Sequence, residues 1–151
     1  MRGFTLIELL VTIGLIIAVS TISFIYIFGH KQARDLQFTV QEITTVLRTA
    51  RNNSVSQEGG SRWGVHFKNT SSGSFFSLFQ GASYSVSTTT ATTSLRSTVQ
   101  FIDPSADNGL TVIFSPITGL PDAPAAVKIS LVSNSQTSST ININSNGEIQ
   151  Y

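Results

Sequence analysis

One carboxylate lies in a stretch of sequence that otherwise carries no charge. Glu8 is the only charged residue of the apolar run from Phe4 to Phe28. At about 1.5 Å rise per residue, a helix of this run would be about 37 Å long, enough to cross a hydrocarbon core about 30 Å thick. A carboxylate in a membrane helix is costly and is normally paired or functional. No cation follows before His30 and Lys31, so Glu8 is expected to pair with an amine at the chain's own start or on a neighbouring molecule.

A cut after Gly3 would supply such an amine. The new α-amine of Phe4 would precede Glu8 by four positions, which is one helical turn. The residues from Gly3 to Glu8, GFTLIE, followed by LLV, closely resemble the processing site of type IV pilins and type II secretion pseudopilins. In that family a prepilin peptidase cuts after the glycine, the new amine is methylated, and the glutamate aids assembly into a helical filament. The resemblance implies cleavage between Gly3 and Phe4, N-methylation of Phe4 and an assembly role for Glu8.

The other polar residues do not form a catalytic or metal-binding pattern. His66 lies in an aromatic strand pattern with no second histidine or cysteine nearby, which favours a packed or surface histidine. Asp103 and Asp107 flank a Pro-Ser-Ala segment that is expected to be a turn, because the ligand set of a calcium site is not visible around it. No Gly-x-Ser-x-Gly or Ser-x-x-Lys pattern is present. We therefore expect no catalytic residue, no metal, no cofactor and no enzymatic activity.

Composition limits the fold and the partners. After a leader and a membrane helix, about 120 of the 151 residues remain, enough for one small domain with its own core. Charged residues make up 11% of the chain, the formal net charge is +1 and there is no cysteine. This balance gives no reason to expect nucleic acid as a partner. The expected organisation is a leader at 1–3, a transmembrane helix half at 4–28, an amphipathic helix half at 29–53 and a β-rich domain at 60–151.

The amphipathic half is predicted from an apolar stripe at spacings of three and four. No proline occurs before Pro104, so one continuous helix is expected from about Phe4 to about Asn53. Glu58 to Ser61, with two glycines, is expected to reverse the chain. The stripe consists of Ala33, Leu36, Val40, Ile43, Leu47 and Ala50.

Short strands are predicted for the rest of the chain. Residues 88–94 are interpreted as a mobile loop, with a polar edge strand as the alternative. Residues Phe114–Pro121 are expected to be a turn-rich connection, and the Asn-Gly pair at 146–147 predicts a C-terminal hairpin. The predicted strands are 62–67, 74–80, 82–87, 99–102, 110–114, 127–132 and 140–144.

The order of one long helix, a Gly-Gly turn and then strands also resembles the GspH/FimT kind of minor pseudopilin. The fold class implied is α+β, with a membrane-spanning N-terminal helix packed on a small antiparallel β-sandwich. The function implied is a structural minor subunit of a type II secretion pseudopilus, anchored in the bacterial inner membrane with its C-terminal domain in the periplasm or exterior. Its implied partners are other pseudopilin or pilin subunits, prepilin peptidase, the inner-membrane assembly platform and membrane lipid.

Two alternatives remain open from the sequence. A minor type IV pilin for pilus assembly or DNA uptake would carry the same N-terminal motif. A membrane-anchored binding or enzymatic domain could also meet that motif by coincidence.

Overall fold

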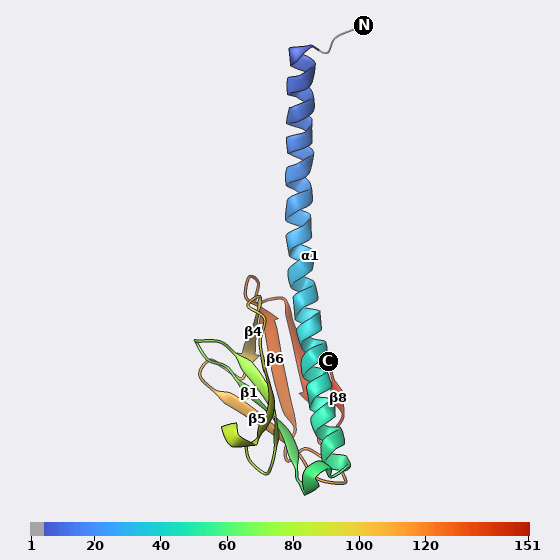
Figure 1. The fold of residues 1–151 in the computed structure, drawn as a ribbon, viewed down its shortest axis with the longest axis vertical. Helices are drawn as coiled ribbons and strands as arrows, with labels where there is room; N and C mark the ends of the chain where they lie inside the picture. The colour runs from blue at the N-terminus through green and yellow to red at the C-terminus, as the bar shows by residue number, and fades with distance from the viewer. Residues whose placement is uncertain (1–4) are drawn as a thin grey trace. The chain divides into compact units, whose positions relative to one another are not determined.

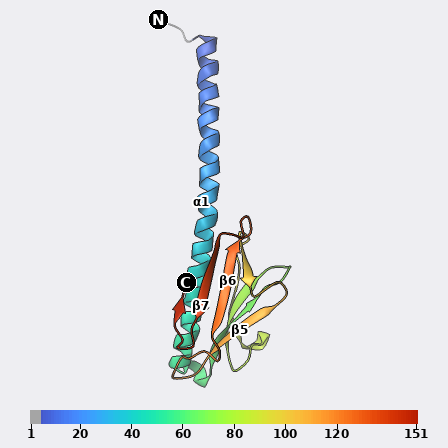
Figure 2. The same cartoon turned by 180° about the vertical axis from the view of Figure 1, so that it is seen from behind.

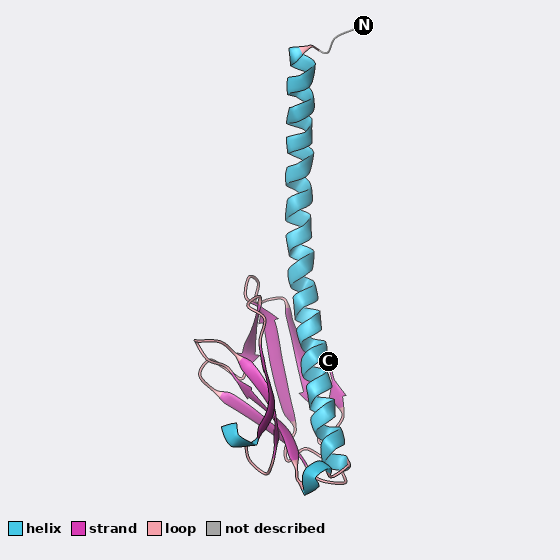
Figure 3. Cartoon of the chain, viewed as in Figure 1, coloured by secondary structure: helices cyan, strands magenta, loops and turns pink. Residues whose placement is uncertain are grey.

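The computed structural model describes residues 5–151, and for residues 21–30 it describes the backbone only. The chain divides into two compact units, one ending at Arg34 and the other running from Asp35 to Tyr151. Helix α1 (Leu6–Val55) contributes residues to both units. The strands, drawn in magenta in Figure 3, all belong to the second unit. They follow α1 in the chain. Helix α1 ends at Val55, two residues after the predicted end at Asn53.

The second unit contains two antiparallel sheets of four strands each (Figure 1). The first sheet has the order β3-β2-β1-β5, and the second has the order β4-β6-β7-β8. The strands are β1 (Trp63–Lys68), β2 (Phe75–Gln80), β3 (Thr89–Ser94), β4 (Val99–Asp103), β5 (Gly109–Phe114), β6 (Ala125–Leu131), β7 (Ser138–Ile143) and β8 (Ile149–Gln150). The predicted α+β class, with a helix on an antiparallel β-sandwich, is confirmed.

The C-terminal part of α1 and the inward faces of both sheets enclose one core. Within the second unit, α1 lies beside β7 and β8, as Figures 1 and 2 both show. The stripe on the helix is buried from Leu36 to Ala50, as predicted, but Ala33 is exposed. Ala33 precedes Asp35, where the second unit begins, so the buried part of the stripe begins at Leu36. The sheets contribute Val65, Phe67, Phe101, Val112, Phe114, Val127, Ile129, Ile141 and Ile143 to this core.

Residues 82–94 differ from the sequence prediction. The predicted strand at 82–87 is wrong, and so is the predicted mobile loop at 88–94, because the strand in this region is β3. The alternative, a polar edge strand, is correct, since β3 pairs only with β2 at the edge of its sheet. The physical reason lies in Tyr84, whose ring stacks on His66 at 3.9 Å and meets Phe79 edge-on at 5.6 Å between ring centroids. These ring contacts hold the segment before β3 against the sheet and leave the β-branched threonines to pair with β2.

The predicted turns agree with the structure. Gly59 and Gly60 have φ angles of 64° and 65° in the reversal after α1. The C-terminal hairpin pairs Ile143 with Ile149, and its turn places Gly147 at a φ of 76°. Asn144 and Glu148 pair across a three-residue loop, 145–147, and a left-handed glycine at the last loop position is typical of such hairpins.

Within the part of the chain whose side chains the structure describes, no helix is long and apolar enough to cross a membrane. The predicted span at 4–28 includes Phe4 and residues 21–28, which lie outside those described residues, and it stays a prediction.

Candidate functional site

The N-terminal site predicted from the sequence is described only in part. Gly3 and Phe4, the residues of the predicted cut, lie outside the described residues. Glu8 lies in the first turn of α1 and is exposed. The Thr5 N–H donates to Glu8 Oε2 at 3.5 Å, and the Glu8 N–H donates to Thr5 Oγ1 at 3.4 Å. Glu8 and Thr5 therefore form a long capping box at the helix start. The pattern Thr-x-x-Glu is the signal in the sequence that would have predicted it.

The surface of α1 next to Glu8 is apolar and exposed. Leu6 is 81% exposed, Ile7 71%, Leu10 66% and Ile16 65%. Leu9, Val11, Ile13 and Leu15 are exposed as well. An amphipathic helix of a globular domain would hide such residues on one face, but here every described side chain from Thr5 to Ser20 is exposed. Such a segment can bury its surface only against another apolar surface, such as lipid or apolar side chains of a partner.

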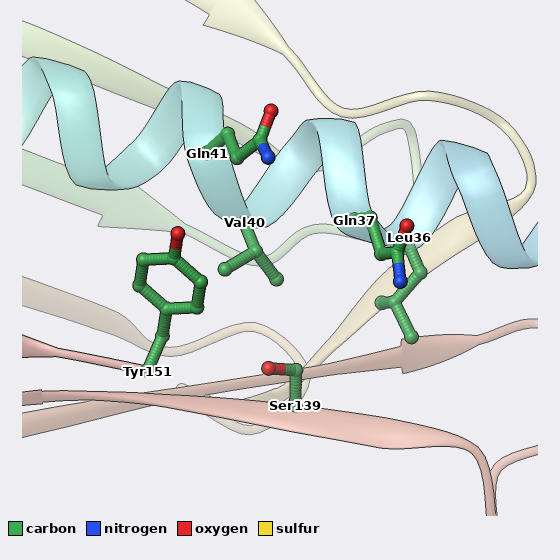
Figure 4. A pocket seen from close by; sticks show the side chains of 6 residues that line it. All are labelled: Leu36, Gln37, Val40, Gln41, Ser139 and Tyr151. Atoms are coloured by element: carbon green, nitrogen blue, oxygen red, sulfur yellow. The ribbon is translucent and has the colours of Figure 1, made fainter.

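A pocket of about 440 Å³ lies between α1 and the second sheet (Figure 4). Tyr151 and Ser139 lie on its sheet side, and α1 lies above them. The lining residues from the helix are Leu36, Gln37, Val40 and Gln41. No side chain that lines this pocket carries a formal charge at neutral pH. Its lining combines short apolar and neutral polar groups, which suits an uncharged ligand or peptide segment.

A second pocket, of about 370 Å³, lies farther along the same helix and is lined by Arg48, Arg51, Asn146, Glu148 and Ile149. Hydrogen bonds from Gln150 and Asn146 lower the pKa of the Glu148 carboxyl. Arg51 donates from Nε to the Gly119 carbonyl at 3.2 Å. Glu148 therefore bonds within its own hairpin, whereas Arg51 bonds to the connection between β5 and β6.

His66 belongs to a small aromatic cluster on the face of the first sheet opposite the core. Its Nδ1 lies 2.8 Å from Thr111 Oγ1, and its ring stacks on Tyr84. Burial and, secondarily, the charge of Lys68 lower the pKa of the His66 imidazole. Phe79 is fully buried in this cluster, where its ring lies over Gly64. The contacts of His66 are those of a packing residue, as the sequence predicted.

The two aspartates considered for calcium lie apart from other metal-ligating groups. Asp103 ends β4 and Asp107 follows it in a turn, with a φ of 62°. The Asp107 carbonyl accepts a hydrogen bond from Lys68 Nζ at 2.9 Å. Among the described residues, no group of three or more histidine, cysteine, aspartate or glutamate side chains is placed to hold a metal ion.

The cations of the second unit are spread over several elements. Arg62 pairs with Asp122, and Arg96 lies 3.9 Å from Glu42. The expectation that nucleic acid is not a partner stays a prediction.

Comparison with known proteins finds solved structures of similar fold but no sequence match. No protein-family model and no curated protein sequence matches the chain. The crystal structure of the type IV minor pilin FimU of Pseudomonas aeruginosa PAO1 superposes with a TM-score of 0.60 at 18% identity, over 78% of this chain and 87% of FimU. A second crystal form of FimU gives 0.57 at 18% identity, over 76% and 90%. The chain has the pilin fold.

The same fold is found in a secretion protein. The minor pseudopilin EpsH of the type 2 secretion system of Vibrio cholerae superposes with a TM-score of 0.53 at 12% identity, over 77% of this chain and 94% of EpsH. The resemblance to the pilin and pseudopilin superfamily that the N-terminal motif suggested is thus confirmed at the level of the fold. The sequence did not predict the pocket between α1 and β7, because its lining comes from three separate stretches of the chain.

Proposed function

We propose that the chain is a structural, non-enzymatic minor subunit of a bacterial pilin-type filament. The observation that carries this proposal is the exposed apolar surface of α1 from Leu6 to Ile16, in a helix whose later residues build the core of a pilin fold. Such a surface needs apolar cover. Membrane lipid supplies that cover before assembly, and the packed helices of neighbouring subunits supply it in a filament.

The N-terminal residues fit this role through processing. Residues 1–3 act as the leader, and prepilin peptidase cuts between Gly3 and Phe4, after which Phe4 is N-methylated. Residues 4–28 anchor the precursor in the inner membrane as a single span, residues 29–53 continue the helix, and residues 60–151 form the domain in the periplasm or exterior. The inner-membrane assembly platform then receives the processed subunit. The support for this scheme is the GFTLIE motif together with the pilin fold.

A minor subunit of a type II secretion pseudopilus is the specific role we propose first. The likeness to EpsH and the absence of cysteine from the sequence support it, because many pilins close a C-terminal loop with a disulfide. The alternative is a minor type IV pilin for pilus assembly or DNA uptake, and the likeness to FimU favours that alternative.

The test uses Glu8, because two substitutions there separate charge from helix capping. Glu8→Gln keeps an N3 residue able to close the capping box with Thr5 but removes the charge, whereas Glu8→Leu removes both. Thr5→Ala is the matched control, since it removes the other half of the box and leaves the carboxylate. If Glu8 pairs with the amine of Phe4 on its own or a neighbouring subunit, both Glu8 variants should be cleaved normally yet fail to enter the filament, while Thr5→Ala enters it.

Mass spectrometry of membranes from the native host measures cleavage and methylation, and co-purification with the other filament subunits measures assembly. Mature chains that still begin at Met1 would refute the processing scheme. Normal assembly of both Glu8 variants would show that Glu8 is not the assembly residue. Deletion of the gene, followed by assays of protein secretion, surface piliation and DNA uptake in parallel, separates the two filament systems.

A further inference from the structure

Two arginines of α1 line the pocket of about 370 Å³ without a carboxylate partner. Arg48 and Arg51 are three residues apart, so they are neighbours on the helix surface, where like charges repel each other. Among the residues that the structure describes, the arginines that form ion pairs are Arg62 and Arg96. An anion bound between Arg48 and Arg51 would relieve their repulsion.

The guanidinium of Arg51 is half-buried and lies against two glycines. Its Nε donates to the Gly119 carbonyl at 3.2 Å. A Cβ added to Gly119 would lie 3.1 Å from Arg51 Nε, and a Cβ added to Gly147 would lie 3.0 Å from the same atom. The missing side chains of these glycines therefore make room for the guanidinium. Because its Nε is already engaged, Arg51 is left with its two terminal nitrogens, a fork that matches the two oxygens of a carboxylate.

The acidic side chain that lines this pocket is already engaged. Hydrogen bonds from Gln150 and Asn146 lower the pKa of the Glu148 carboxyl, and both donors belong to its own hairpin. The lining carries two arginines against this one glutamate, so it is positive overall. β8 leads away from this pocket, because Tyr151 lines the other pocket. The positive charge of the lining thus remains available to a carboxylate from outside this domain.

An exposed apolar border lies beside the arginines. Val55 follows Arg51 by four residues on the same face of α1 and is 43% exposed. Ile117, two residues before Gly119, is 68% exposed and has a φ of 64°, which is unfavourable for a β-branched residue. Its N–H donates to the Ser54 carbonyl at 3.2 Å, which holds this backbone in place. Strained residues are concentrated at binding sites, and this one keeps an apolar side chain in solvent next to an unpaired cation.

We propose that this pocket binds a carboxylate of an acidic segment of another protein, whose neighbouring apolar residue packs on Val55 and Ile117. The terminal nitrogens of Arg51 donate to both carboxylate oxygens, and Arg48 adds a further charge-assisted hydrogen bond. Charge complementarity selects the acidic residue. The apolar border favours a polypeptide over a small free anion. The proposal does not depend on the filament role.

The experiment titrates the full-length chain, in detergent micelles, with short peptides. The probe is acetyl-Gly-Leu-Glu-Leu-Gly-amide, and the control peptide has glutamine in place of glutamate. The NMR resonances of the Nε–Hε groups of Arg48 and Arg51 are the readout. We expect the glutamate peptide to shift both resonances and the glutamine peptide to bind about tenfold more weakly or less, as for lost charge-assisted hydrogen bonds. Equal binding of the two peptides would overturn the proposal.

Inorganic phosphate distinguishes a peptide site from a site for free anions. It can pair with the arginines but cannot use the apolar border, so it should bind more weakly than the glutamate peptide. Equal or tighter binding of phosphate would overturn the assignment to a protein segment.

Substitutions test the two halves of the site separately. Arg48→Gln removes an exposed charge and should weaken the glutamate peptide about threefold without changing Tm. Lys128→Gln makes the same change in net charge at an exposed position of β6 and should leave the affinity unchanged. Ile117→Asn removes the apolar side chain but tolerates the left-handed backbone, so it should weaken the peptide without lowering Tm. Unchanged affinity in Arg48→Gln or Ile117→Asn would overturn the proposal, and so would an equal loss in Lys128→Gln.

Discussion

The Ser54 hydroxyl joins the end of α1 to the first sheet, and its removal by the substitution Ser54→Ala should destabilise the domain. Its side chain is fully buried. The Oγ accepts a hydrogen bond from the Trp63 N–H at 2.8 Å and donates to the Phe114 carbonyl at 3.1 Å. Trp63 and Phe114 face each other in the β1–β5 pairing, so the hydroxyl bridges the two strands where the helix meets them. The Ser54 carbonyl also accepts from the Ile117 N–H at 3.2 Å.

The expected effect of Ser54→Ala can be worked out from these bonds. A buried donor left without a partner costs about 1–3 kcal/mol, and each lost neutral hydrogen bond is worth about 1 kcal/mol. The higher helix propensity of alanine offsets about 0.5 kcal/mol of this loss of stability. The net loss of unfolding free energy should be about 2 kcal/mol, which for a domain of this size lowers Tm by about 8 °C.

Thermal unfolding of the full-length chain in micelles measures this loss. Trp63 is the only tryptophan in the sequence and is buried, so its fluorescence reports unfolding at the site, while far-ultraviolet circular dichroism reports the whole domain. Ser56→Ala is the control, because the Ser56 hydroxyl is exposed and donates only to the Asn53 carbonyl at 3.2 Å. That change should stay within about 0.5 kcal/mol of the wild type. If Ser54→Ala is equally mild and the Trp63 amide remains protected from exchange, the hydroxyl does not bridge the strands.

Three further predictions concern stability. The Thr44 hydroxyl is buried and has no hydrogen-bond partner among the described residues, so Thr44→Val should raise the free energy of unfolding by about 1 kcal/mol in denaturant titrations. A Cβ on Gly64 would lie 2.6 Å from the Val112 carbonyl oxygen and 2.7 Å from the Phe79 ring, so Gly64→Ala should lower Tm by an amount equivalent to about 2 kcal/mol. The pKa of His66 is lowered in the folded state from a usual value of 6.5, so the unfolded state binds more protons below neutral pH, and stability should fall as pH decreases through about 6.5.

Each of these predictions has a matched control. Thr45→Val changes an exposed threonine whose hydroxyl donates to the Gln41 carbonyl, and it should not stabilise the chain. A Gly64→Ala variant with the wild-type Tm would show that the sheet can absorb the extra methyl group. His66→Asn should flatten the pH dependence of Tm between about pH 7.5 and 5.5. A slope that persists in His66→Asn would assign the proton to another group.

Local rules of sequence predicted much of the fold correctly. The apolar periodicity from Leu36 to Ala50 and the lack of proline before Pro104 predicted the C-terminal end of α1 to within two residues. Both signals are local, because they depend only on residues of the helix itself. The paired glycines and Asn146-Gly147 predicted both turns, since positive φ is a local requirement. Six of the seven predicted strands overlap observed ones for the same reason: alternation of apolar and polar residues is visible within five or six positions.

The errors and omissions arose where distant segments decide the structure. Residues 82–87 are not a strand because the Tyr84 ring packs on His66 of β1 and Phe79 of β2. Local strand propensity does not predict such a contact between separate segments. The bridging role of Ser54 requires β1 and β5 to be neighbours, although they are separated by three strands in the sequence. The pocket between α1 and β7 exists only because α1, β7 and Tyr151 meet in the folded domain. The sequence by itself determined the motif at Gly3, Phe4 and Glu8 and the order of the elements. Tertiary packing decided which strands are neighbours, which side chains are buried and where a pocket forms. The physical reason is that strand pairing and buried contacts join segments that lie far apart in the chain.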